Sequence, residues 1–71
     1  MKFEIGKFYR HTTGKDLAII GELETSMYGF ALIAETNDIT ESFMAVGREE
    51  SATANYTEIT KEEWMKNFSK D

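Results

Sequence analysis

The chain contains 71 residues, of which 41% are hydrophobic and 13% aromatic, and its formal net charge is −5. This length and composition predict one globular domain over residues 1–71 and exclude an intrinsically disordered chain. The sequence has no cysteine and one histidine, which excludes disulfides, a thiolate metal site and a multi-histidine zinc site.

Five short strands are predicted where β-favouring residues lie between turn signals. They cover about residues 7–12, 17–25, 30–35, 42–46 and 55–59. In the second strand, Leu17, Ile19 and Leu23 share one face, and Gly21 on the same parity is typical of a β-bulge or of a place where another group packs closely. Residues 49–55 read as part of a polar loop, but their composition also favours a helical turn.

A terminal helix is predicted over about residues 61–69. Thr60 and Glu63 have the spacing of a capping box, in which each side chain accepts a hydrogen bond from the backbone N–H of the other residue. Trp64, Met65 and Phe68 cluster at helical spacing on one apolar face, and we assign Trp64 to the core, with an interface as the alternative. The helix is therefore expected to cover the sheet as a lid.

The predicted fold class is α+β. Short strands with turns about every ten residues favour a small four- to five-stranded antiparallel sheet, or a partly open barrel of SH3-like size, with one carboxy-terminal helix. Nine aromatic rings are hard to bury in so short a chain. We therefore expect self-association or an exposed aromatic site.

Charge is distributed unevenly along the chain. Residues 1–15 carry four basic residues against one acidic residue, a net of +3, whereas residues 16–63 carry eleven acidic against two basic residues, a net of −9. One interpretation is attraction between these parts within the fold or between subunits. The other is a local anion site in an acidic protein. The overall negative charge argues against binding of duplex nucleic acid.

Aromatic rings next to cations suit a phosphate-bearing planar ligand, because a ring stacks on the base and the cations neutralise the phosphate. The candidate ligand-binding residues are Tyr9, Arg10, His11, Lys15, Tyr28, Arg48 and Tyr56. The alternative is that Tyr9 is a rim residue and the cations are solvated. For Arg48, the alternative is an ion pair with Glu49, Glu50 or a neighbouring chain.

No catalytic, metal or cofactor site is predicted. A lone histidine outside any nucleophile motif is more often a hydrogen-bonding surface residue than a general base, and the serines lie in no nucleophile-elbow motif. We expect a protein that is not an enzyme. No apolar run approaches the ~20 residues that span a membrane, and the amino terminus lacks the apolar core of a secretory signal. We therefore expect a cytoplasmic protein.

The whole chain resembles a class of small accessory proteins encoded by phages and prophages of Gram-positive bacteria. Four segments carry the resemblance: FEIGKFYRHTTGK, TSMYGFALIAE, AVGREE and NYTEITKEEWMKNF. A tryptophan is expected in such proteins where Tyr56 stands here. The resemblance implies action by binding, either blocking a host protein or sequestering a nucleotide signal of host immunity in the host cytoplasm.

Three hypotheses follow. The first is a non-enzymatic phage-type accessory protein that sequesters a small anionic, nucleotide-like ligand and so counters host defence. The alternative is an acidic protein-binding inhibitor that mimics nucleic acid. Its acidic residues would be Glu22, Glu24, Glu35, Asp38, Glu41, Glu49 and Glu50. The third is a structural phage protein with no ligand.

Overall fold

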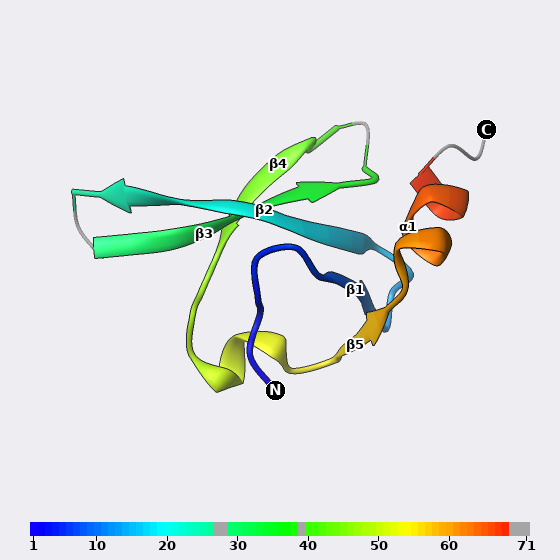
Figure 1. Cartoon of the computed structure of the whole chain (residues 1–71), viewed down its shortest axis with the longest axis horizontal. Helices are drawn as coiled ribbons and strands as arrows, with labels where there is room; N and C mark the ends of the chain where they lie inside the picture. Colours follow the sequence, from blue (N-terminus) through cyan, green and yellow to red (C-terminus); the bar gives the residue numbers. More distant parts are fainter. Residues whose placement is uncertain (27–28, 39, 69–71) are drawn as a thin grey trace.

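The computed structural model describes residues 1–26, 29–38 and 40–68 and confirms the α+β fold (Figure 1). A five-stranded antiparallel sheet has the strand order β4-β3-β2-β1-β5. The strands are β1 (Phe8–His11), β2 (Asp16–Thr25), β3 (Gly29–Thr36), β4 (Phe43–Val46) and β5 (Tyr56–Ile59). A 3₁₀ helix, η1 (Glu50–Thr53), precedes β5, and the helix α1 (Lys61–Phe68) follows it. The helical turn considered for residues 49–55 is thus present as η1.

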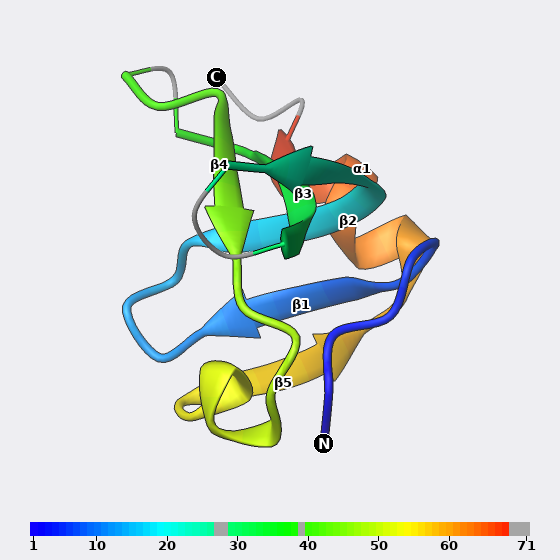
Figure 2. The same ribbon diagram turned by 90° about the vertical axis from the view of Figure 1, so that its left-hand side faces the viewer.

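The core lies on one face of the sheet, called the inner face here. Its buried members come from β1, β2, β3 and the amino-terminal segment, and are Phe3, Tyr9, Leu17, Ile19, Leu32 and Ala34. Figure 2 shows the amino-terminal segment and η1 on one side of the strands. The Phe3 ring meets Tyr9 edge to face, with 4.9 Å between ring centroids, and meets Tyr56 at 5.2 Å. The amino-terminal segment therefore closes this core.

The bulge predicted at Gly21 is confirmed, and it changes which side chains of β2 face the core. Ile19 pairs with Ala34, but Gly21 pairs with Ile33, so Ile20 is the inserted residue. A one-residue insertion moves the following side chains to the opposite face. The prediction that Leu23 lies on the core face is therefore wrong, and its side chain is 60% exposed.

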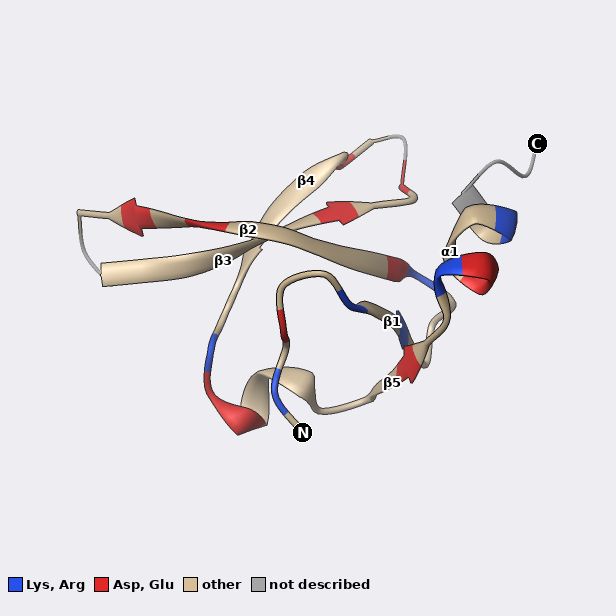
Figure 3. Cartoon of the chain, viewed as in Figure 1, with Lys and Arg blue, Asp and Glu red and all other residues tan. Residues whose placement is uncertain are grey.

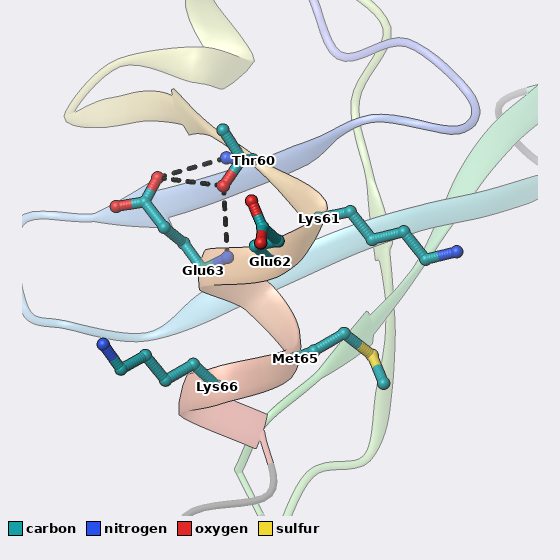
Figure 4. Close-up of a pocket in the computed structure, with 6 residues that line it drawn as sticks. All are labelled: Thr60, Lys61, Glu62, Glu63, Met65 and Lys66. Carbon is teal, nitrogen blue, oxygen red and sulfur yellow. Dashed lines mark hydrogen bonds between the residues drawn. The ribbon is translucent and has the colours of Figure 1, made fainter.

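Helix α1 packs on the other face of the sheet, called the outer face, over β1 and β2. Trp64 is buried, and its ring lies 6.0 Å from the ring of Phe8. The capping box is formed: Thr60 Oγ1 accepts from Glu63 N at 3.1 Å, and Glu63 Oε1 accepts from Thr60 N at 3.2 Å (Figure 4). Met65 is exposed instead of sharing the buried position of Trp64, because consecutive helical residues point in different directions.

The sheet is open. Among the described strands, β4 and β5 lie at opposite ends of the order and are not hydrogen-bonded to each other. The β2–β3 hairpin projects beyond the other strands in Figure 1. None of the described helices has the length and apolar character needed to cross a membrane.

The first prediction concerns α1 as the cover of the β1–β2 region. Trp64→Ala should lower the free energy of unfolding by about 3–5 kcal/mol, because it removes a buried ring. Thr60→Ala should lower it by about 1 kcal/mol through loss of the cap. Urea denaturation followed by circular dichroism measures both values. An unchanged unfolding midpoint for the tryptophan variant would contradict the packing of α1 on the sheet.

Candidate functional site

A buried carboxylate organises the outer face around Arg10. Asp16, the first residue of β2, is fully buried. Its two oxygens accept from Arg10 Nε at 2.9 Å and Arg10 Nη2 at 3.1 Å, which is a bidentate pair between β1 and β2. Asn67 of α1 adds a third donor, with Nδ2 2.9 Å from Asp16 Oδ2. The hydrogen bond to Asp16 raises the pKa of Arg10 above its usual value.

This network makes Arg10 a structural residue. A charge removed from water is costly unless ionic and hydrogen-bonding partners compensate it. Arg10 supplies that compensation to Asp16, and the Asp16 backbone N–H donates to Asn37 Oδ1 at 3.1 Å. The guanidinium assigned to an anionic ligand is thus already engaged by a carboxylate of the same chain.

Three other predicted residues do come together, at the end of the sheet where β1 turns into β2. The His11 ring lies edge to face on the Tyr56 ring, with 4.8 Å between centroids, because His11 and Tyr56 are cross-strand partners in β1 and β5. His11 Nδ1 accepts from Thr13 N at 3.2 Å. His11 Nδ1 also lies 2.9 Å from Thr13 Oγ1, so Thr13 occupies this ring nitrogen.

Lys15 belongs to this group but is neutralised within the chain. Its Nζ lies 2.8 Å from Glu41 Oε1 and 4.0 Å from Asp38 Oδ2. The hydrogen bond to Glu41 raises the pKa of Lys15, and hydrogen bonds from Thr40 lower the pKa of Asp38. Burial raises the pKa of Tyr56, although the positive charge of Lys15 acts in the opposite direction. An anion bound here would have to compete with two carboxylates.

The remaining predicted ligand residues do not join this group. Tyr9 is 1% exposed, so its ring has no free face for a base, and its hydroxyl accepts from Glu4 N at 2.9 Å. Tyr9 is therefore a core residue and the rim position considered for it is wrong, and the ligand role predicted for it has no exposed ring to support it. Tyr28 lies outside the described residues. Arg48 pairs with Glu22 at 2.7 Å, because the bulge places Glu22 opposite Leu32 on the inner face. The sequence instead indicated a pair with Glu49, Glu50 or a neighbouring chain.

The acidic residues of the alternative hypothesis do not form one face. Figure 3 shows them on the β2–β3 hairpin, around the β3–β4 connection, and beside η1. Four of the seven accept ion pairs within the chain: Glu22 from Arg48, Asp38 and Glu41 from Lys15, and Glu50 from the amino terminus. The charge is therefore spread over the molecule and partly compensated.

Several apolar side chains are exposed on the outer face, and their position was not predicted from the sequence. Cross-strand pairing places Gly21, Ile33 and Ala45 in one row of the outer face, and Leu23 and Ala31 in the next. Helix α1 covers the neighbouring row at Phe8 and Ala18 but does not extend over these rows. We call the uncovered surface the outer patch, and it consists of Ile20, Leu23, Ile33, Phe43 and Ala45.

The side chains along the exposed side of α1 form no convergent site. In Figure 4, Glu63 and Lys66 extend to one side of the helix, whereas Lys61 and Met65 extend to the other. The described part of the chain also holds no group of three or more metal-ligating side chains.

The second prediction separates the two arginines. Arg10→Ala should lower the free energy of unfolding by about 2–3 kcal/mol, because the substitution leaves the Asp16 charge without its main partner. The loss is smaller than for a fully buried pair, because Arg10 is partly exposed. Arg48→Ala should cost less than about 1 kcal/mol, because both members of its pair with Glu22 are solvent-exposed. Thermal and urea unfolding provide the measurement. Equal losses for both variants would contradict the structural role of Arg10.

Three comparisons with known proteins bear on identity. No family model matches the chain, and no significant match was found among curated proteins or among solved structures. Function is therefore argued from the geometry of the chain itself.

Proposed function

We propose that this protein is a non-enzymatic binding module that docks through the outer patch on a partner protein with an apolar centre and basic surroundings. The observation that carries the proposal is the apolar surface left uncovered beside α1. Ile20 is 51% exposed, Leu23 60% and Phe43 59%. Contiguous exposed apolar surface on a small soluble domain often marks an interaction site.

The charges favour a basic partner. Among the described residues, six acidic side chains lack an ion pair within the chain, and they are Glu4, Glu24, Glu35, Glu49, Glu62 and Glu63. In the same part of the chain, three basic side chains lack one, and they are Lys2, Lys61 and Lys66. Glu35 lies on the outer face between Ala18 and Phe43. Complementary charge at the rim accelerates encounter and selects the partner, while the apolar centre supplies affinity.

The resemblance to phage accessory proteins gives this proposal a context. It implies a host protein as the partner, the cytoplasm of the infected cell as the location, and inhibition as the consequence of binding. The proposal keeps the hypothesis of an acidic protein-binding inhibitor. It does not require mimicry of nucleic acid, because the outer patch provides the contact.

The third prediction tests the patch directly. A photo-crosslinking amino acid at Leu23, in protein produced in its native host, should yield an adduct with another protein. The same probe at Thr12, exposed in the β1–β2 turn, should not. Ile20→Lys should abolish the adduct because it places a charge in the patch. Ile5→Lys should leave it intact, because Ile5 is equally exposed at 54% but lies in the amino-terminal segment.

Mass spectrometry of the adduct then identifies the crosslinked protein and gives its mass. Equal adducts from both probe positions, or an adduct insensitive to Ile20→Lys, would contradict the proposal. An adduct of twice the chain mass would assign the patch to a second copy and would also contradict it.

Ligand sequestration is the second candidate, and the meeting of His11, Lys15 and Tyr56 favours it. The proposed ligand is a small nucleotide-like anion, with a ring stacked near Tyr56 and its phosphate on Lys15 and His11. Such a ligand would displace Glu41 and Asp38 from Lys15.

The fourth prediction concerns ligand sequestration and is tested by a thermal-shift screen against cyclic dinucleotides, cyclic oligonucleotides and NAD-derived signals. Sequestration predicts a selective stabilisation, about 2.7 kcal/mol at a hundred times the dissociation constant. The shift would disappear in Lys15→Ala and persist in Lys61→Ala. The protein-binding proposal predicts no shift with any of these compounds. Arg10→Ala is not a suitable probe, because it exposes the Asp16 network.

A further inference from the structure

The backbone edge of β4 is not used by the functions proposed above, although the Phe43 and Ala45 side chains of this strand belong to the outer patch. Natural sheets blunt their edge strands with charged residues, proline or bulges. β4 reads FMAV and contains none of these, and its Phe43 and Ala45 side chains are exposed. The opposite edge differs, since β5 carries Glu58, which pairs with Lys7 at 3.6 Å.

The direction of the backbone groups along β4 determines which N–H and C=O groups are available for hydrogen bonds at this edge. Ser42 accepts from Thr36 N at 2.7 Å, so the Ser42 carbonyl points toward β3. Because backbone groups alternate in direction along an antiparallel strand, Met44 and Val46 also face β3. Phe43 and Ala45 therefore direct their N–H and C=O groups away from the sheet. An added strand would find two donors and two acceptors there.

We propose that β4 pairs antiparallel with β4 of a second copy, which joins two sheets into one. A two-fold axis perpendicular to the sheet keeps the outer faces on the same side. It allows a register with Met44 opposite its own copy and Phe43 opposite Ala45 of the second copy. This register forms four backbone hydrogen bonds and places each Phe43 ring over a small residue.

The adjacent symmetric register is less favourable. With Ala45 opposite its own copy, Glu41 would lie opposite Glu49, and like charges directly across strands are destabilising. The chosen register places Glu41 opposite Gly47. The choice of a second copy also fits the size of the domain, because so short a chain without disulfides gains stability from assembly.

The pairing goes beyond the proposed function and does not depend on it. It leaves Ile20, Leu23 and Ile33 of the outer patch uncovered, and it makes the patches of two copies continuous across the joined edge. Since each copy has a net charge of −5, long-range repulsion opposes the dimer, and added salt should strengthen it by screening.

The fifth prediction is tested with single-cysteine variants, which are straightforward to interpret because the chain has no native cysteine. Met44→Cys should form a disulfide-linked dimer under mild oxidation, because a directly opposed, non-hydrogen-bonded pair places the Cα atoms about 4.5 Å apart. Ala45→Cys should remain reduced, because the two copies of residue 45 would lie diagonally, about 7–8 Å apart. No disulfide from Met44→Cys, or equal disulfide from both, would overturn the pairing.

Sedimentation equilibrium gives a test without cysteine chemistry. The wild-type chain should show a dimer whose fraction rises with salt. Phe43→Lys should abolish this dimer, while Phe30→Lys, an equally exposed phenylalanine on the β2–β3 hairpin, should retain it. A wild-type monomer at every concentration, or a dimer unaffected by Phe43→Lys, would overturn the inference. Because Phe43 also belongs to the outer patch, the proposed function is judged separately, from the adduct at Leu23 in a chain that keeps Phe43.

Discussion

The carboxylate of Asp16 is the constraint on which the outer face of this protein depends. It is fully buried and receives donors from two other elements, Arg10 on β1 and Asn67 on α1. A buried charge left without these partners would cost several kcal/mol. The carboxylate therefore holds α1 over the β1–β2 part of the sheet, where Trp64 covers Phe8. The rest of the outer face is left uncovered.

The bulge at Ile20 determines what this uncovered surface contains. Before the bulge, β2 directs Leu17 and Ile19 into the core. After it, Leu23 faces outward and Glu22 takes the inner side, where it pairs with Arg48. One inserted residue thus places an apolar side chain on the surface and a carboxylate at the end of the core. We interpret the exposed apolar face as functional because a strand of regular parity would have buried Leu23.

The features that could be predicted from the sequence are those with local causes. The capping box follows from Thr60 and Glu63 three residues apart, and the bulge follows from a glycine on the core parity of β2. The outer patch could not be predicted, because it depends on where α1 docks. The burial of Tyr9 could not be predicted for a similar reason, because Phe3, which packs against it, comes from a segment outside the strands. The partners of Lys15 and Arg48 also come from distant parts of the chain.

The most direct test of this account is hydrogen exchange of the backbone amides in Asp16→Asn, which keeps the size of the side chain and removes its charge. If the carboxylate holds α1 on the sheet, the amides of the last turns of α1 should lose protection. The amides of the β2–β3 hairpin beyond the bulge should exchange as in the wild-type chain. Unchanged protection of α1, or an equal loss across all strands, would contradict the central role given to Asp16.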